Sequence, residues 1–403
     1  MPLSCPPGLA QPGKTGAWLE VARVRQSVRL GRVAGIPVGA NWSVIVILAI
    51  IADTLAVDVL PAEVRHQSPA IYWAVGCVTA VLFLAALLAH ELSHALVARH
   101  NGVGVRSITL WALGGVSELE ADPPSAGADL RIALAGPAAS LAAAAIFLGV
   151  AAAIGRERGA GIAVAAASWL ALMNGLLAVF NLLPGAPLDG GRVLRAALWR
   201  HYGDRDRAAT SAARSGRYLG ALLAVLGIAE FLLTGDFLGG LWLMLIGWFL
   251  TSAAGAEEAA VASSVALRGL RVTDVMMPDP EIAPGWMTVA DFAARIAAVR
   301  SAQRAFPVVS ADARLTGIVI TARLAALSRE QRAVRRVEQV AMPVPVKYLA
   351  APDDPVLSLA TRSPLGGEVV AVVLDHGRIV GMVTTADMHQ AELRRGLLAA
   401  SQR

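Results

Sequence analysis

The sequence predicts an α-helical membrane protein of about six transmembrane helices, followed by a C-terminal α+β part that is built from two similar copies. Composition is the first observation: hydrophobic residues make up 56% and charged residues 16% of the 403 residues, whereas about 25% are charged in ordinary soluble domains. The second is that long apolar stretches recur before residue 256, and the third is that a soluble, repeating pattern follows.

Each apolar stretch is long enough, or nearly so, to cross a bilayer as a helix. The fifth stretch is the shortest. The predicted spans are 42–60, 71–88 with a helical extension to 99, 132–154, 161–183, 218–233 and 237–255. Residues 1–41 are predicted to form an N-terminal segment outside the membrane, with a short extended stretch at 31–40. Residues 106–119 alternate and contain a glycine pair, which predicts a small hairpin.

The net charge of +5 comes mainly from arginine, and its placement is explained by membrane topology without a nucleic-acid partner. With the N-terminus in the cytosol, fifteen Lys and Arg residues fall in the cytosolic loops. Only Arg65, Arg156 and Arg158 fall outside. The bias predicts a multi-pass protein of the cell membrane whose N-terminus and C-terminal part are cytosolic.

The second predicted helix ends in the pentapeptide HELSH at 90–94. His90 and His94 are four residues apart, so they lie on one helical face, roughly 6 Å apart along the axis. Both rings can therefore reach one zinc ion, with Glu91 beside them as a base for the metal-bound water. The alternative is a solvated helix end whose histidines cap the last carbonyls. Ionisable groups at the end of a membrane helix need partners, which favours the metal site.

The fourth predicted span ends in NLLPGAPLDGGR at 181–192, where prolines and glycines break the helix. On the topology above, Asp189 then lies at the same cytosolic depth as HELSH. Two histidines, one carboxylate and a water make an open four-coordinate zinc site. The alternative for Asp189 is an N-cap of the amphipathic segment 190–202.

These two motifs, in this order on two membrane helices, resemble those of the site-2 proteases, which are intramembrane zinc metalloproteases. The resemblance covers about residues 30–255. It implies that His90, His94 and Asp189 bind one zinc ion per chain and that Glu91 is the catalytic base. It also implies that Asn181 supports the substrate carbonyl, and that the hairpin with its glycine pair can pair with an unwound substrate strand.

The C-terminal pattern occurs twice: VTDVMMP at 272–278 returns as VEQVAMP at 337–343. The two copies, about 270–327 and 336–395, are similar to a pair of CBS (cystathionine-β-synthase) domains. The resemblance implies an adenosine nucleotide held by Thr384 and Asp387 in the second copy. The first copy carries Ile320 and Arg323 at the matching places, so at most one standard site is expected. The alternative is a dimerisation module without a ligand.

The sequence therefore predicts three parts: the N-terminal segment 1–41, a transmembrane zinc protease domain at 42–256 and a tandem CBS domain at 257–403. The expected activity is hydrolysis of a peptide bond in single-span membrane proteins, such as anti-sigma factors, under CBS control. The protein is also expected to form a homodimer through its CBS domains. A CBS-regulated transporter or channel is the competing function, and the complete motif set argues against an inactive scaffold.

Overall fold

The computed structural model describes residues 27–112, 114–155, 161–299, 303–360 and 362–401. The chain divides into two compact units, Met1–Glu258 and Ala259–Arg403. Among the described residues, six helices are long and apolar enough to cross a membrane, which confirms the predicted number. They are Ser43–Glu63, Pro69–His100, Ala126–Ile154, Gly161–Asn181, Arg205–Thr234 and Phe237–Leu267.

The first of these spans is composite, with α1 (Ser43–Thr54), a π-helical stretch (Leu55–Val59) and α2 (Leu60–Glu63). The others are single helices, numbered along the chain. They are α3 (Pro69–His100), α4 (Ala126–Ile154), α5 (Gly161–Asn181), α7 (Arg205–Thr234) and α8 (Phe237–Leu267). Between the fourth and fifth spans, α6 (Asp189–Tyr202) is a shorter helix of mixed polarity.

Helix α7 is much longer than the predicted span 218–233, because it runs for 30 residues from Arg205. Its polar first half carries a buried alanine face of Ala208, Ala209, Ala212 and Ala213, and alanine is the best helix former. This half packs against α6. The prediction from hydropathy was therefore wrong about where α7 begins, since a helix that packs on another helix need not be apolar all round.

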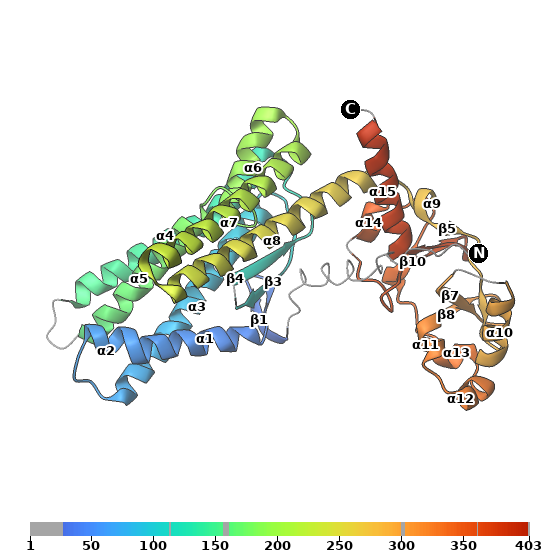
Figure 1. Ribbon diagram of the computed structural model, residues 1–403, viewed down its shortest axis with the longest axis horizontal. Coiled ribbons are helices and arrows are strands. Elements are labelled where there is room, and N and C mark those ends of the chain that lie inside the picture. The colour runs from blue at the N-terminus through green and yellow to red at the C-terminus, as the bar shows by residue number, and fades with distance from the viewer. Residues whose placement is uncertain (1–26, 113, 156–160, 300–302, 361, 402–403) are drawn as a thin grey trace, which may run out of the picture. The chain divides into compact units, whose positions relative to one another are not determined.

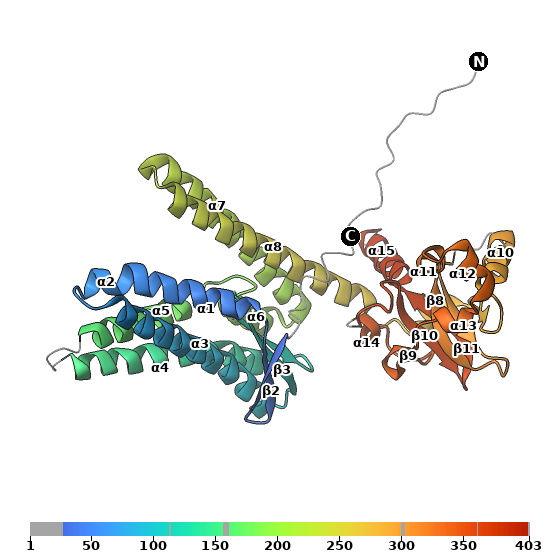
Figure 2. The ribbon, with the colours of Figure 1, turned by 90° about the horizontal axis from the view of Figure 1, so that it is seen from below.

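A four-stranded sheet lies at one end of α1 and α3 (Figures 1 and 2). Its order is β1-β2-β3-β4. The strands are β1 (Val28–Val33), β2 (Ile36–Ala40), β3 (Val105–Trp111) and β4 (Gly114–Leu119). The antiparallel pair of β3 and β4 is the hairpin predicted at 106–119. Ile36, Val38 and Ile108 pack on Ala95 of α3, which places the edge strand β4 beside the HELSH turn.

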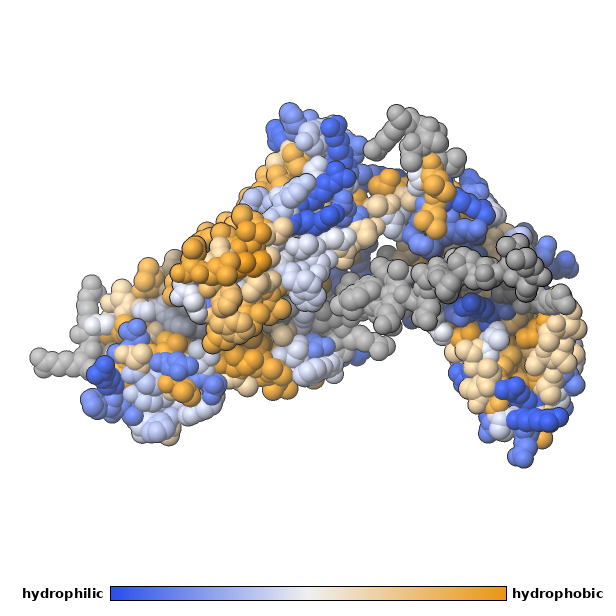
Figure 3. Space-filling view, in the orientation of Figure 1, coloured by the Kyte–Doolittle hydropathy of each residue, from blue (hydrophilic) through white to orange (hydrophobic). Residues whose placement is uncertain are grey.

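The surface of the first unit agrees with a membrane location. Figure 3 shows a broad apolar surface over its helices, with hydrophilic side chains gathered around α6. Many large apolar side chains are exposed along α7 and α8, including Leu233, Leu238 and Trp242. In a protein surrounded by water such an extensive exposed apolar surface would be unfavourable, and in a bilayer it faces lipid.

The second unit contains two copies of one α+β arrangement. The first copy comprises α9 (Val272–Val275), β5 (Met277–Pro278), β6 (Ala283–Pro284), α10 (Val289–Val299), β7 (Ala305–Val309), β8 (Leu315–Ile320) and α11 (Thr321–Ala325), and α12 (Arg329–Val334) follows it. The second comprises α13 (Val337–Val340), a 3₁₀ turn (Val346–Tyr348), β9 (Leu349–Ala350), α14 (Leu357–Ala360), β10 (Val369–Asp375), β11 (Arg378–Thr384) and α15 (Thr385–Ser401).

The two copies exchange their opening segments. Met277, at the start of the first copy, pairs with Met382 in the last strand of the second. Met342 occupies the equivalent position in the second copy and forms a bridge with Ile318 in the first. Each sheet is thus completed by the other copy, and residues of both copies share one core cluster. This is why the two copies fold as a pair.

Candidate metal centre

Three side chains that are far apart in the sequence converge at the end of α3. His90 and His94 come from α3, and Asp189 is the first residue of α6. The distance between His90 Nε2 and His94 Nε2 is 3.2 Å, and each of these nitrogens lies 3.2 Å from Asp189 Oδ2. We call these three atoms the ligand triangle. Both histidines are buried, and Asp189 is half-buried.

The hydrogen bonds of the two Nδ1 atoms determine whether the Nε2 atoms of the ligand triangle carry a lone pair or a proton. His94 Nδ1 lies 2.6 Å from the carbonyl oxygen of Ile132. A carbonyl can only accept, so Nδ1 donates and the neutral ring has a lone pair on Nε2. His90 Nδ1 lies 2.9 Å from the hydroxyl of Ser140, which can fix the same tautomer. Two nitrogen lone pairs and a carboxylate oxygen then face one another, and this arrangement is stable only with a cation or a proton between them.

The dimensions of the ligand triangle fit zinc. Bonds of about 2.0–2.1 Å in tetrahedral geometry separate neighbouring ligands by roughly 3.3 Å, and all three edges here measure 3.2 Å. Burial alone would raise the pKa of Asp189, but its contacts with His90 and His94 outweigh burial and lower this pKa to about 2. The carboxylate is therefore ionised at neutral pH, as a zinc ligand must be. The set leaves a fourth position open, as in catalytic sites.

Helix α4 forms the wall behind the two imidazoles. It supplies the Ile132 carbonyl and the Ser140 hydroxyl, and Gly136 lies between them on the same face. A Cβ added at Gly136 would overlap His94 Nε2 and His90 Nε2. Only glycine therefore allows the helix to approach this closely. None of these three residues was identified from the sequence. The available signal was that Gly136 and Ser140 are four residues apart and therefore lie on one face of a largely apolar helix.

Glu91 lies next to the ligand triangle and is held by strand β4. Its side chain is nearly buried, with 9% of its surface exposed. The Ser117 hydroxyl donates to Glu91 Oε2 over 3.0 Å. A Cβ on Gly115 would overlap the Glu91 side chain, so one glycine of the predicted pair is required for this contact. The sequence predicts this hairpin but gives no sign of the role of Ser117.

Asp189 is positioned by the break between α5 and α6. The N-cap residue of α6 is Leu188, and it makes no side-chain capping bond. Asp189 is thus the first helical residue and does not cap the helix, in contrast to the alternative considered from the sequence. Its carboxylate instead points toward the histidines of α3. An acidic residue in the first turn is also favoured by the helix dipole.

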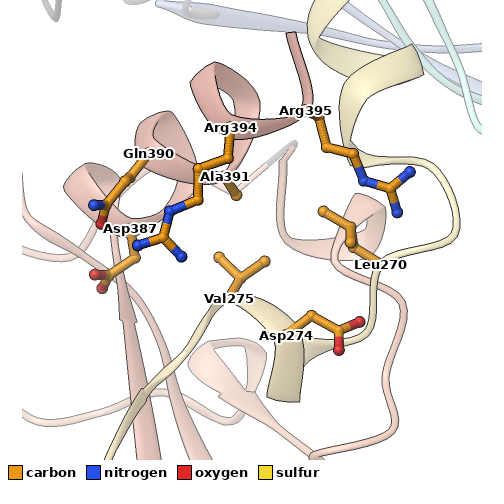
Figure 4. Close-up of a pocket in the computed structure, with 8 residues that line it drawn as sticks. All are labelled: Leu270, Asp274, Val275, Asp387, Gln390, Ala391, Arg394 and Arg395. Carbon is orange, nitrogen blue, oxygen red and sulfur yellow. The ribbon is translucent and has the colours of Figure 1, made fainter. Parts of the chain in front are cut away.

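The remaining predicted residues lie elsewhere. Asn181 is the last residue of α5 and is half-buried. Within the part of the chain that the structure describes, no hydrogen bond joins it to the ligand triangle. Thr384 and Asp387 lie in the second unit, where the Thr384 hydroxyl donates to Asp387 Oδ2 over 2.7 Å. Figure 4 shows Asp387 and Arg394 along α15, lining a pocket with Asp274 of α9.

The chain is similar to known proteins over most of its length. The model of Peptidase family M50 matches residues 78–157 and 155–226. A protein of Mycobacterium tuberculosis named "Putative zinc metalloprotease Rip3" is 43% identical over 366 residues, which cover 91% of this chain and 92% of that protein.

Two solved structures were also matched. The site-2 protease from Methanocaldococcus jannaschii is 29% identical, with a TM-score of 0.40, and covers 57% of this chain and 94% of that one. The CBS domain of a bacterial CNNM/CorC family Mg²⁺ transporter, in complex with ATP, is 21% identical, with a TM-score of 0.28. That alignment covers 34% of this chain and 97% of the CBS domain.

Six apolar helices, with a His–His–Asp triangle where α3 meets the start of α6 and a glutamate beside it, are the features of a membrane metallopeptidase. The relative that matches 91% of the chain is named as a zinc metalloprotease. The chain belongs to peptidase family M50, the site-2 proteases. The predicted family and enzyme class are thereby confirmed, and the second unit has the predicted α+β arrangement of two similar copies.

Proposed function

We propose that the protein is an intramembrane zinc endopeptidase that hydrolyses a peptide bond of single-span membrane proteins. His90, His94 and Asp189 would hold one zinc ion, and Glu91 would act as the base. The observation that carries the proposal is the ligand triangle, whose three edges of 3.2 Å match one face of a zinc tetrahedron. Glu91 follows His90 directly in the helix, so its carboxylate lies on the adjacent face.

Each residue would have a separate task in hydrolysis. Bound zinc would supply an acidified water and polarise the substrate carbonyl. Glu91 would accept the proton of the water and later give it to the leaving amine. The hydrogen bond from Ser117 leaves one carboxylate oxygen of Glu91 for that proton. Asn181 would donate its amide N–H to the substrate carbonyl, after a local movement that brings it to the site.

The substrate must be partly unwound before it can be cut, because the amides of a helix are hydrogen-bonded within the helix. Strand β4 is the edge strand of its sheet and carries both Gly115 and Ser117 next to Glu91. An unwound substrate segment would add to this edge as a further strand. Helix-breaking residues near the cleavage site should therefore favour cleavage.

The distribution of arginines supports an orientation in the cell membrane with the N-terminus, α6 and the CBS pair in the cytosol. We assign residues 1–41 to an N-terminal segment, 42–256 to the protease domain and 257–403 to the CBS domain. Cleavage near the cytosolic end of α3 would release a fragment into the cytosol. Membrane-held regulators such as anti-sigma factors are the proposed substrates.

The CBS pair is the proposed regulatory part, with an adenosine nucleotide as its ligand. The backbone N–H and the hydroxyl of Thr384 both donate to Asp387, which leaves the second carboxylate oxygen of Asp387 for ribose hydroxyls. Arg394 lines the same pocket and would favour a phosphate. A homodimer formed through the CBS domains without a ligand is the alternative, and the oligomeric state with and without nucleotide distinguishes the two.

Metal analysis and a cleavage assay on the purified full-length protein test the protease proposal. The wild type should contain about one zinc per chain, as an open catalytic site of three protein ligands requires. Asp189→Ala should lose both zinc and cleavage, because a buried pair of histidines alone holds the ion weakly. Zinc retained at full occupancy by Asp189→Ala would contradict the proposed ligand set. A zinc-free wild type would favour the competing function of a transporter or channel.

A further inference from the structure

A buried ion pair joins the first turn of α4 to the second turn of α6, at some distance from the ligand triangle. Asp129, in the first turn of α4, is fully buried. Arg195 of α6 donates to both of its oxygens, Nε to Oδ2 over 2.9 Å and Nη2 to Oδ1 over 2.8 Å. Arg192, one turn earlier in α6, adds a contact of 3.4 Å to Oδ1. Burial alone would lower the pKa of Arg195, but its hydrogen bonds and charge contact with Asp129 outweigh burial and raise this pKa.

This contact fixes α6 in both rotation and translation. Two parallel N–H donors of a guanidinium on one carboxylate define a plane as well as a distance, which a single hydrogen bond does not. Arg192 and Arg195 are three residues apart, so one face of α6 supplies both side chains that bind the Asp129 carboxylate. Asp189 begins the same helix, about 9 Å along the axis from Arg195. A fixed first turn therefore means a fixed carboxylate in the ligand triangle.

The same helix α4 also fixes the other two corners of the ligand triangle. Asp129, Ile132, Gly136 and Ser140 lie at intervals of three and four residues, so they share one face of α4. Ile132 and Ser140 hold the two imidazoles through His94 Nδ1 and His90 Nδ1. One rigid helix face thus contacts the histidines directly and holds Asp189 through α6.

We propose that Asp129 and Arg195 are positioning residues of the zinc site, which set the place of Asp189 relative to His90 and His94. This inference rests on the proposed zinc site and adds to it the means by which the third ligand, on a separate helix, is brought into register. Neither residue touches the ligand triangle. Their effect on Asp189 is transmitted through the first two turns of α6.

The test measures zinc affinity and thermal stability separately on the purified full-length protein. Zinc binding is followed by competition between Zn²⁺ and a chelating dye, and stability by the unfolding midpoint of the zinc-free protein. Asp129→Asn removes the charge, and Arg195→Lys keeps the charge but loses the two-point contact. Each should weaken zinc binding by about 10- to 100-fold, the range found when groups behind metal ligands are removed.

A matched control and a double variant separate an effect on the position of Asp189 from an effect on the stability of the fold. Arg217→Lys makes the same change in an ion pair with Glu258 at the surface, and its zinc affinity should equal that of the wild type. Asp129→Leu combined with Arg195→Met replaces the buried pair by apolar side chains, which should restore the unfolding midpoint. Zinc affinity should stay low in this double variant, because the two-point contact that sets the rotation of the first turns of α6 is then missing.

Four results would overturn the proposal. Wild-type zinc affinity in Arg195→Lys would show that the two-point contact does not matter. Zinc affinity that returns to the wild-type value together with stability in the double variant would show a purely structural pair. A wild type that binds no zinc would refute the metal site and the positioning role together, whereas zinc lost in Asp189→Ala but kept in Asp129→Asn would refute the positioning role alone.

Discussion

The two units of the molecule bury different kinds of side chain. Of the described residues, eight polar or charged ones are buried, and all belong to the first unit. They are Thr79, His90, Glu91, His94, Thr109, Asp129, Ser140 and Asn174. The CBS unit, as far as the structure describes it, has an interior of apolar residues such as Phe292, Phe306 and Val372. In the second unit, Thr384 and Asp387, the residues proposed to bind a nucleotide, are only half-buried.

This difference separates the proposed chemistry from its proposed regulation. A buried polar group costs free energy unless it is paired, so a cluster of such groups inside apolar helices needs a function that compensates for it. Desolvation also strengthens the interactions that bind and polarise reacting groups. A surface pocket with half-buried polar groups suits a ligand that binds and leaves. We therefore expect small changes in the first unit to affect zinc and catalysis strongly, and changes in the second to affect ligand binding without changing the zinc content.

The largest effect is expected from Gly136→Ala, because the added Cβ would overlap both imidazoles. Zinc affinity should fall by at least about 100-fold, the upper end of the range for groups behind metal ligands, and proteolysis should fall with it. Gly149→Ala in the same helix is the control, since its added Cβ meets no atom within 4 Å. Metal analysis of both variants tests this prediction. Normal zinc content in Gly136→Ala would mean that α4 does not approach the site this closely.

Ser117→Ala should have an intermediate effect that is confined to catalysis. The variant loses one hydrogen bond to Glu91, so kcat should fall about tenfold, as expected for about 1.4 kcal/mol. KM and zinc content should stay the same, and Ser117→Thr should restore kcat because it keeps the hydroxyl. Steady-state kinetics on a single-span substrate provides the measurement. A loss of zinc in Ser117→Ala would assign this residue to the metal site instead.

The smallest effect on the protease is expected from Asp387→Ala in the CBS unit. Binding of ATP or AMP to the full-length protein, measured by calorimetry, should weaken about tenfold with the loss of hydrogen bonds to a charged group. Zinc content should not change. Asp375→Ala, at an exposed end of β10, is the matched control. Unaltered nucleotide binding by Asp387→Ala would remove this site, and no binding by the wild type would favour the dimerisation module.

The sequence predicted those parts of the site that follow from local geometry. Helical periodicity places His90 and His94 on one face, and the broken helix at 181–192 indicates a turn that carries Asp189. The contacts of Ser117 with Glu91 and of Arg195 with Asp129 join residues that are 26 and 66 positions apart. Such pairs are set by tertiary packing, which one sequence does not reveal.

Two further features escaped prediction for physical reasons. The group that holds His94 is the backbone carbonyl of Ile132, and any residue type supplies a carbonyl. The early start of α7 is hidden because its polar first half packs through alanines alone. Asp129 did leave a sign in the sequence, since a carboxylate at the start of a membrane span needs a partner.

The most direct test of the account is the zinc content and activity of Glu91→Gln. This change keeps the ligand triangle and the shape of the side chain but removes the base. Zinc should remain at about one per chain, while cleavage of a single-span substrate should fall by about 10²- to 10⁴-fold. Wild-type turnover by Glu91→Gln would contradict the proposed role of Glu91, and loss of zinc would mean that Glu91 belongs to the metal site itself.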